Sequence, residues 1–194
     1  SNARHPDTVE YTSLIEEDLK RRDFTMNAIA LSMPEGKLFD PLEGKKDIHE
    51  KRIRAIGDPL ERFNEDGLRV LRACRFTCQL NFSIEPETFK ALAKSAQSLK
   101  NVSNERIQEE LTKMLHSPAP SVAFKVMMRT GILQVILPEL AACVGVEQKG
   151  MHRFDVFEHS IYSCDGAPVD NLSLRLAALL HDVGKPECRT IGPD

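Results

Sequence analysis

One short segment, residues 65–76, combines acids and arginines in a spacing suited to nucleotide recognition. On a helix of 3.6 residues per turn, Asp66 and Arg69 lie about one turn apart on a polar face. A carboxylate that accepts and a guanidinium that donates can pair with the edge of a base, and further arginines can hold a triphosphate. The alternative is a solvated face with an intrahelical Glu65–Arg69 pair. Two more arginines share this face or lie at its boundary, Arg72 and Arg75. The opposite face is apolar and predicts a core contact through Leu68, Val70, Leu71 and Cys74.

A second cluster, Arg21-Arg22-Asp23, lies in a stretch of good helix formers that predicts a helix over residues 18–31. On such a helix Asp23 and Asn27 share one face, one turn apart and next to Arg22. This set could hold a ribose hydroxyl and a phosphate. Asp23 could equally be the helix N-cap, with Arg21 and Arg22 in solvent.

Composition narrows the class of protein. The chain has 194 residues and a net charge of −3, which argues against a protein that coats nucleic acid with a basic surface. Residues 19–75 nevertheless hold 13 Lys/Arg against 10 Asp/Glu, so a phosphate-bearing ligand is expected there. No apolar run approaches a membrane span and no secretory signal is present, which favours a cytoplasmic protein. Five cysteines without a Cys-x-x-Cys pair predict reduced thiols rather than a disulfide framework or a thiolate zinc site.

The elements that must position these residues are mostly helical. Short strands are expected at 37–40 and 52–56, each closed by Pro or Gly. Further helices are predicted at 60–80, 86–98, 104–116, 119–130 and 156–164, with a buried helix at 171–183. Ser103 or Asn104, and Asp170 or Asn171, are the expected N-caps of two of them. The predicted fold class is therefore mainly α, with a small α+β part followed by a helical body.

Several motifs occur in a fixed order along the chain: Arg21-Arg22-Asp23, Asp40-Pro41-x-x-Gly44-x-x-Asp47, Ile53-Arg54-Ala55-Ile56-Gly57-Asp58-Pro59, Glu65-Asp66-Gly67-Leu68-Arg69 and Glu105-Arg106-Ile107-x-x-Glu110-Leu111. In this order and spacing the chain resembles the class II tRNA nucleotidyltransferases, which include bacterial CCA-adding enzymes and poly(A) polymerases. The resemblance spans nearly all of residues 5–190. Gly67 stands where this family commonly has Pro, which predicts a less rigid entry to the helix.

The resemblance implies a division into three parts: the end of a nucleotidyltransferase head (4–58), a helical neck that binds nucleotide and RNA (59–137), and the start of an HD-type body (138–194). It implies CTP and ATP as ligands and a tRNA or other RNA 3′ end as partner. Asp66 and Arg69 would read the base and Asp23 would bind ribose. The nucleotide or its phosphates would be contacted by Arg22, Arg72 and Arg75.

In this family, catalysis depends on an Asp-x-Asp pair that holds magnesium and is preceded by a Gly-Ser motif. The 194 residues contain neither motif, and the pair is expected N-terminal to Arg4. Ser1-Asn2-Ala3 resembles the remnant of an expression tag, and both ends of the chain read as cuts in a longer protein. We therefore expect a fragment that recognises nucleotides poorly and catalyses nothing.

The last part of the chain resembles the start of an HD domain, in which histidines and aspartates bind a divalent metal for phosphoester hydrolysis. His159, His181 and Asp182 are the candidate ligands, with His152 and Asp155 near them in sequence. The alternative is that these are buried side chains with hydrogen bonds only. Two rival functions follow for the whole chain: a metal-dependent phosphohydrolase of the HD type, or a non-catalytic RNA-binding helical module.

Overall fold

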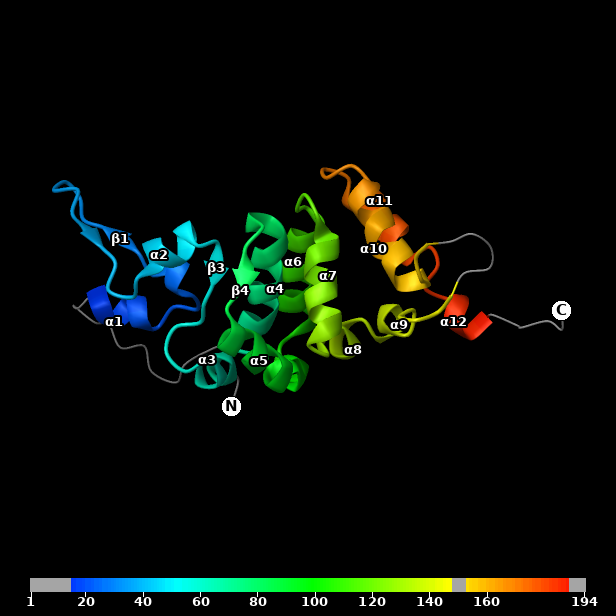
Figure 1. Ribbon diagram of the computed structural model, residues 1–194, viewed down its shortest axis with the longest axis horizontal. Coiled ribbons are helices and arrows are strands. Elements are labelled where there is room, and N and C mark those ends of the chain that lie inside the picture. The colour runs from blue at the N-terminus through cyan, green and yellow to red at the C-terminus, as the bar shows by residue number, and fades with distance from the viewer. Residues whose placement is uncertain (1–14, 148–152, 189–194) are drawn as a thin grey trace.

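The structure is a computed structural model that describes residues 15–147 and 153–188. The molecule is elongated, with small strands and helices at one end and helices throughout the rest (Figure 1). This confirms the mainly α class with a small α+β part. The first part of the chain contains α1 (Ile15–Lys20), η1 (Thr25–Asn27), β1 (Ala30–Leu31), β2 (Leu38–Phe39), α2 (Gly44–His49) and β3 (Arg52–Ile53).

The middle of the chain is a group of packed helices around α4. It contains α3 (Pro59–Glu65), α4 (Leu68–Leu80), β4 (Ser83–Ile84), α5 (Pro86–Ser95), η2 (Ala96–Asn101), α6 (Asn104–Leu115) and α7 (Pro120–Arg129). Helix α4 packs against both α6 and α7. Its predicted core face is confirmed, because Leu68, Val70, Leu71 and Cys74 are all buried. The last part of the chain contains α8 (Ile132–Ile136), α9 (Pro138–Ala141), α10 (Val156–Gly166), α11 (Leu172–Leu180) and α12 (Lys185–Cys188).

The strands are short and pair in two small sheets. Strands β1 and β2 form an antiparallel hairpin in which Ala30 faces Phe39. Strand β3 pairs in parallel with β4, so that Arg52 lies beside Ser83 across the whole of α3 and α4. This second pairing anchors the N-terminal part of the chain to the helical part.

The helix predicted over 18–31 is wrong beyond Lys20. Phe24 has extended backbone angles and forms an isolated antiparallel bridge with Ala55. The N–H of Thr25 donates to the carbonyl of Arg54, and the N–H of Ile56 donates to the carbonyl of Asp23. Pairing with this distant segment satisfies backbone groups that a helix would otherwise satisfy, so tertiary structure overrides local propensity.

The Asp40-Pro41-x-x-Gly44-x-x-Asp47 motif holds this bridge in place. The carboxylate of Asp40 accepts from the N–H of Gly44 at 2.7 Å at the start of α2. A side chain at Gly44 would meet the carbonyl oxygen of Thr25 at 2.2 Å, so only glycine fits there. Asp47 then accepts from the hydroxyl of Thr25 at 2.7 Å and from Arg54 at 3.0 Å. The motif therefore packs against Thr25 and holds this residue in place.

The helix predicted over 60–80 is two helices. Helix α3 ends at Glu65, and Asp66 has extended backbone angles before α4 begins. The carboxylate of Asp66 accepts from the N–H of Leu68 at 3.1 Å and so covers the start of α4. A side chain at Gly67 would lie 2.9 Å from the hydroxyl of Ser98 and 3.0 Å from its carbonyl, so this break is closely packed.

A buried arginine helps to join the C-terminal helices to the middle group, in addition to the packing of α10 on α7 and of α11 on α6. Arg175 of α11 donates to the carbonyls of Leu115 and Ser117 at 2.8 and 2.7 Å, and to that of Ala167 at 3.1 Å. Asn171 caps α11 by accepting from Leu174, which confirms one of the two predicted caps. The helix predicted as buried over 171–183 ends at Leu180 and packs on one side only. Three of its leucines are exposed, Leu174, Leu176 and Leu180.

Of the two predicted caps for α6, Ser103 occupies the N-cap position, but its side chain makes no capping hydrogen bond. After α11, the chain leads into α12, in which Pro186 lies in the first turn, where proline is tolerated. None of the helices among the described residues is both long and apolar enough to span a membrane.

Candidate nucleotide-binding site

A cavity of about 500 Å³ lies where segment 22–27 meets α4 and α6. Five of the six predicted nucleotide-binding residues line it; the sixth, Arg75, does not. The lining residues are Arg22, Asp23, Asn27, Asp66, Leu68, Arg69, Arg72, Phe76 and Arg106. Four arginines against two aspartates give this cavity a cationic excess in a chain whose net charge is −3. Such a surface favours a phosphate-bearing ligand.

Asp66 is fixed at the break between α3 and α4. One carboxylate oxygen caps α4 through Leu68, and the other accepts from the guanidinium of Arg106 at 2.7 Å. Arg106 comes from the first turn of α6, 40 residues away. Sequence reasoning did not select Arg106 for the site, although it lies in the Glu105-Arg106 motif that did stand out. Asp66 therefore points into the cavity in one defined orientation.

Arg69 is held by three partners. Its Nη1 donates to Glu65 at 2.5 Å and to the carbonyl of Arg62 at 2.9 Å, and its Nη2 donates to the carbonyl of Arg21 at 3.0 Å. Only 17% of its side chain is exposed. Three of its five N–H donors thus have partners among the described residues, which leaves two for a ligand. The predicted Glu65–Arg69 pair exists, but it bridges α3 and α4 rather than lying within one helix.

Arg69 also links two segments of the fold. An exposed arginine would contribute little to folding. Arg69 instead ties the end of α1 to α4, and Arg62 makes a parallel link by donating to the carbonyl of Lys20 at 2.9 Å. Losing the Arg69 side chain should therefore affect stability as well as any recognition.

Asp23 also lines the cavity and is only 7% exposed. One of its oxygens accepts from the N–H of Phe24 at 2.8 Å and from the amide of Asn27 at 2.9 Å. The other accepts both Nε and Nη2 of Arg72, at 2.7 and 2.6 Å. The predicted proximity of Asp23 and Asn27 is confirmed, although a 3₁₀ turn and not an α-helix produces it. Asp23 is not the N-cap of a long helix.

Arg22 and Phe76 complete the wall. Arg22 donates to Asp18 at 3.2 Å and to the carbonyl of Asn27 at 3.3 Å, and half of its side chain is exposed. The ring of Phe76 meets Phe24 edge to face at 5.8 Å, and the guanidinium of Arg72 lies 5.6 Å from its centre. Phe76 thereby supports Arg72 from the apolar side.

Arg75 faces away from this cavity and is 8% exposed. It donates to Glu110 at 2.5 Å and to Gln79 at 2.5 Å, and its guanidinium lies 4.2 Å from the centre of the Phe76 ring. Glu110 is itself almost fully buried on α6. The structure therefore places Arg75 in the α4–α6 interface, where a buried ion pair holds the two helices together.

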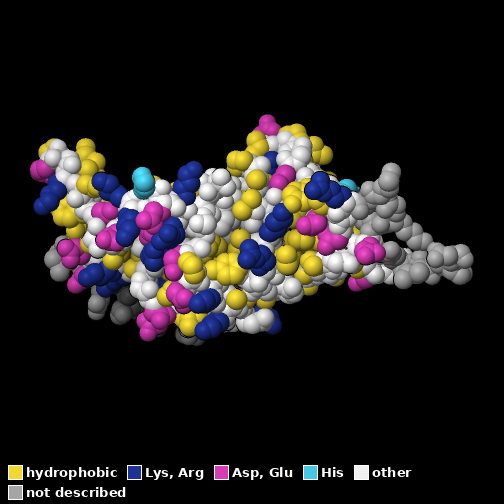
Figure 2. All heavy atoms as spheres, in the orientation of Figure 1, with side chains coloured by type: hydrophobic (Ala, Val, Ile, Leu, Met, Phe, Trp, Pro, Cys, Tyr) yellow, Lys and Arg dark blue, Asp and Glu magenta, His cyan; other side chains and the backbone are white. Residues whose placement is uncertain are grey.

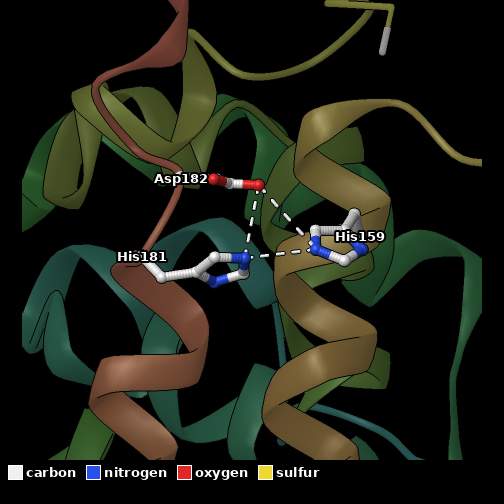
Figure 3. A group of neighbouring side chains, drawn as sticks. All are labelled: His159, His181 and Asp182. Atoms are coloured by element: carbon white, nitrogen blue, oxygen red, sulfur yellow. Dashed lines mark hydrogen bonds and ion pairs between the residues drawn. The ribbon is translucent and has the colours of Figure 1, made fainter. Parts of the chain in front are cut away.

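A second candidate site lies between α10 and α11. His159 projects from α10 toward His181 and Asp182 at the end of α11 (Figure 3). The Nε2 atoms of the two histidines are 3.1 Å apart, and the Asp182 oxygen lies 3.2 Å from His181 and 3.7 Å from His159. Two ligands bound to one metal at about 2.1 Å lie about 3.0–3.4 Å apart, so this donor set fits a divalent cation.

The neighbours of this cluster differ from the sequence expectation. Asp155 caps α10 by accepting from Glu158 at 2.7 Å and also accepts from Gly145 at 2.8 Å, so it is a capping residue. His152 lies outside the described residues. Lys185 donates to Asp182 at 2.6 Å. Burial by itself raises the pKa of Asp182, but Lys185 and the two histidines outweigh it and hold that pKa below its usual value.

Comparison with known proteins agrees with this architecture. Residues 1–54 match the sequence model of the poly(A) polymerase head domain. Residues 81–144 match the model described as the probable RNA- and SrmB-binding site of polymerase A. The chain belongs to the poly(A) polymerase and class II tRNA nucleotidyltransferase family.

Individual relatives are consistent with this assignment. The chain is 46% identical over 131 residues to a CCA-adding enzyme of Levilactobacillus brevis, which covers 68% of this chain and 33% of the relative. It is 40% identical over 190 residues to an A-adding tRNA nucleotidyltransferase of Deinococcus radiodurans, which covers 93% of this chain and 43% of the relative. The chain therefore spans less than half the length of these relatives.

A solved structure shares the fold over nearly the same extent. The CCA-adding enzyme of Bacillus stearothermophilus in complex with CTP is 30% identical, with a TM-score of 0.63 over 93% of this chain and 50% of that one. A CCA-adding enzyme in complex with ATP is 29% identical, with a TM-score of 0.58 over 70% of this chain and 32% of that one.

Proposed function

We propose that this chain is the nucleotide-selecting part of an enzyme that adds CMP or AMP to the 3′ end of tRNA without a nucleic-acid template. The observation that carries the proposal is the pair formed by Asp66 and Arg69 at one cavity. Asp66 offers a fixed acceptor, and Arg69 retains two donors beside it. The relatives named for CCA and A addition, and the solved complexes with CTP and ATP, support the same function.

The chemistry of this pair explains a choice of C and A over U and G. Cytosine and adenine each present an amino group that donates next to a ring nitrogen that accepts. An aspartate can accept a hydrogen bond from the amino group while an arginine donates one to the ring nitrogen. Uracil and guanine present the reverse pattern, with a carbonyl beside a ring N–H. Their carbonyl would face Asp66, and their N–H would face Arg69.

The remaining lining residues suit the rest of a nucleotide. We assign the ribose to the side of the cavity formed by Asp23 and Asn27, and the phosphates to Arg22 and Arg72. Because Asp23 holds Arg72 in a two-pronged pair, it also orients that guanidinium. Arg106 positions Asp66 in the same way from the other side. Arg75 takes no direct part in this scheme.

Magnesium is implied by the family for the transfer step itself. The 194 residues hold no Asp-x-Asp pair, so these residues do not fit the family's metal centre. The chain's own contribution is to bind and orient the nucleotide.

The His159, His181 and Asp182 cluster supports a second proposal. Its three donor atoms lie together in a geometry that fits a divalent cation, and we propose that they hold one. In a larger protein, a metal held this way could bind and polarise a phosphoester. This activity would be separate from nucleotide addition.

The proposed function is tested with the complete gene product. A good bidentate base contact is worth about 1–3 kcal/mol, so Arg69→Ala should relax the choice among CTP, ATP, UTP and GTP by roughly tenfold or more in kcat/KM. Arg72→Ala should weaken all four alike, because phosphates carry no base identity. The matched control is Lys94→Ala on the exposed face of α5.

Thermal melts accompany these assays, because Arg69 also ties α1 to α4. If Arg69→Ala lowers kcat/KM equally for all four nucleotides, Arg69 is a structural residue and the base-reading proposal is wrong. The conservative Arg69→Lys should recover part of the stability but little of the base selection, because a lysine cannot reproduce the planar fork.

A further inference from the structure

Two shielded ion pairs of α4 meet at one aromatic ring, that of Phe76. Arg72 pairs with Asp23 at the nucleotide cavity, and Arg75 pairs with Glu110 in the α4–α6 interface. On the face drawn in Figure 2, Lys and Arg side chains lie among Asp and Glu side chains. Exposed pairs of that kind contribute little. The two pairs of α4 differ from them, because the carboxylates of Asp23 and Glu110 are almost fully buried.

The carboxylate partner of Arg72 holds its guanidinium at one edge only. The Nε atom donates to Oδ2 of Asp23 at 2.7 Å, and the Nη2 atom lies 2.6 Å from the same oxygen. Contacts with a single oxygen fix the distance of the group, but the group can still turn about that oxygen. The other N–H groups of Arg72 have no partner among the described residues, and Arg72 lines the cavity. A second restraint is therefore needed to hold these donors in one direction.

The ring of Phe76 supplies that restraint. Phe76 follows Arg72 by about one turn of α4, and the centre of the Arg72 guanidinium lies 5.6 Å from the centre of the ring. A cation within about 6 Å of an aromatic centroid is attracted by the quadrupole of the ring. This attraction keeps the guanidinium beside the ring and so limits its rotation about the Asp23 oxygen. Phe76 lines the same cavity as Arg72.

Two neighbours fix the ring of Phe76 in turn. The buried ring of Phe24 meets it edge to face, with centres 5.8 Å apart and planes at 89°. The guanidinium of Arg75 lies 4.2 Å from its centre, and Arg75 is itself held by Glu110 and Gln79, both at 2.5 Å. Arg75 does not line the cavity, yet it stabilises a ring that does.

We propose that Phe76 is a positioning residue for the triphosphate and that it acts through the guanidinium of Arg72. The inference rests on the proposed function for one point, the assignment of phosphates to Arg72. It adds an uncharged residue that controls how strongly the phosphates are bound. The pair assigned to the base, Asp66 and Arg69, is held by other partners, so base selection does not depend on this ring.

The test uses the complete gene product and two inhibitors that report on different parts of the nucleotide. Tripolyphosphate reports on the phosphate contacts, and cytidine reports on the base and ribose contacts. Phe76→Leu keeps an apolar side chain but removes the ring, and should raise the inhibition constant (Ki) of tripolyphosphate about fivefold. The Ki of cytidine should stay within about twofold of the original value. Phe76→Tyr keeps the ring and should restore the Ki of tripolyphosphate.

A second series keeps the size of the side chain. Phenylalanine with one, two or three ring fluorines is placed at position 76, because fluorine weakens the negative face of the ring and changes its shape little. The Ki of tripolyphosphate should rise stepwise, to about fivefold with three fluorines. Phe82→Leu is the matched control, because Phe82 is also partly buried but does not line the nucleotide cavity. It should leave both inhibition constants unchanged.

Two results would overturn the proposal. One is a tripolyphosphate Ki that stays constant along the fluorine series, because a ring that only fills space gives this result. The other is an equal rise of both inhibition constants in Phe76→Leu, which is the effect of a general disturbance of the fold.

Arg72→Ala separates this inference from the proposed function. If Arg72→Ala leaves the Ki of tripolyphosphate unchanged, the phosphate assignment is wrong and the role of Phe76 is wrong with it. If Arg72→Ala raises that Ki but the Phe76 series does not, the phosphate assignment stands and only the role of Phe76 is wrong.

Discussion

Asp66 and Arg106 form an ion pair at 2.7 Å across 40 residues of chain, and this pair fixes the acceptor of the candidate nucleotide site. Both side chains are mostly shielded from solvent. The pair therefore couples the start of α6 to the start of α4. It also orients the Asp66 carboxylate without help from a ligand.

This coupling predicts a non-additive pair of substitutions. Asp66→Asn keeps an acceptor for the cap on Leu68 but removes the charge, and Arg106→Gln removes the other charge. Each should lower the free energy of unfolding by about 1–2 kcal/mol. The double variant should cost about 1 kcal/mol less than the sum, measured by urea unfolding. Additive costs would show that the two groups do not depend on each other.

The 194-residue chain should not add nucleotides to tRNA. It has no Asp-x-Asp pair to hold the metal ions of the transfer step. Incubation with magnesium, radiolabelled CTP or ATP and a tRNA that lacks its 3′ end should give no labelled tRNA. Measurable incorporation would mean that the reacting carboxylates lie elsewhere in these residues. The complete gene product serves as the positive control.

The His159, His181 and Asp182 cluster should bind a divalent metal only weakly in this chain. Three ligands leave the coordination sphere open, and Lys185 competes for the Asp182 carboxylate at 2.6 Å. Elemental analysis after dialysis should therefore find well under one transition metal per chain. In a Co²⁺ titration, Lys185→Ala should tighten binding and His181→Ala should abolish it. One tightly held metal per chain without any substitution would show that a further ligand completes the site.

Thiol reactivity should distinguish one cysteine from the other four. Burial raises the pKa of Cys164 to about 11 and also raises the pKa of Cys74, Cys78 and Cys143. Cys188 is exposed. At pH 8 a thiol reagent should modify one cysteine per chain quickly and all five only after unfolding, because the thiolate is the reactive form. Cys188→Ser should remove the fast phase, and a second fast thiol in that variant would reveal opening of a packed region.

Glu85 should make stability depend on acid pH. Burial alone would raise its pKa, but hydrogen bonds from the backbone and side chain of Thr88 hold it below its usual value. A lowered pKa in the folded state adds stability above the unfolded-state pKa, and this stability is lost as the pH falls through the folded-state value. Glu85→Ala should therefore cost about 1 kcal/mol at pH 7 and much less below pH 3. An equal cost of Glu85→Ala at pH 7 and below pH 3 would contradict this prediction.

Local patterns were sufficient to predict much of the fold. The apolar face of α4 and the helices that became α5, α6, α7 and α10 follow from periodicity and breakers, since these signals act within a few residues. The break at Asp66 was missed because it depends on the packing of Gly67 against Ser98. The false helix beyond Lys20 has the same origin, because Phe24 pairs with a segment about thirty residues away.

Spacing alone could bring site residues together only where one element supplied them, whereas the placement of Arg22 and Asp23 with them follows from the family resemblance. Arg69 and Arg72 share a helix, so their spacing placed them together. Arg106 comes from another helix, and nothing within α4 indicates it. Arg75 differs from Arg72 by less than one turn, yet a buried partner on α6 turns it into an interface residue. Which arginine of a series faces the ligand is thus decided by the neighbouring helix.

The links from Arg62 and Arg69 to the carbonyls of Lys20 and Arg21 use main-chain oxygens as acceptors. Every residue type supplies such an oxygen, so a substitution at position 20 leaves the connection to α3 and α4 intact. Insertion or deletion of a single residue there would shift both acceptors out of reach. At this connection the number of residues is constrained, whereas the residue type at position 20 is not.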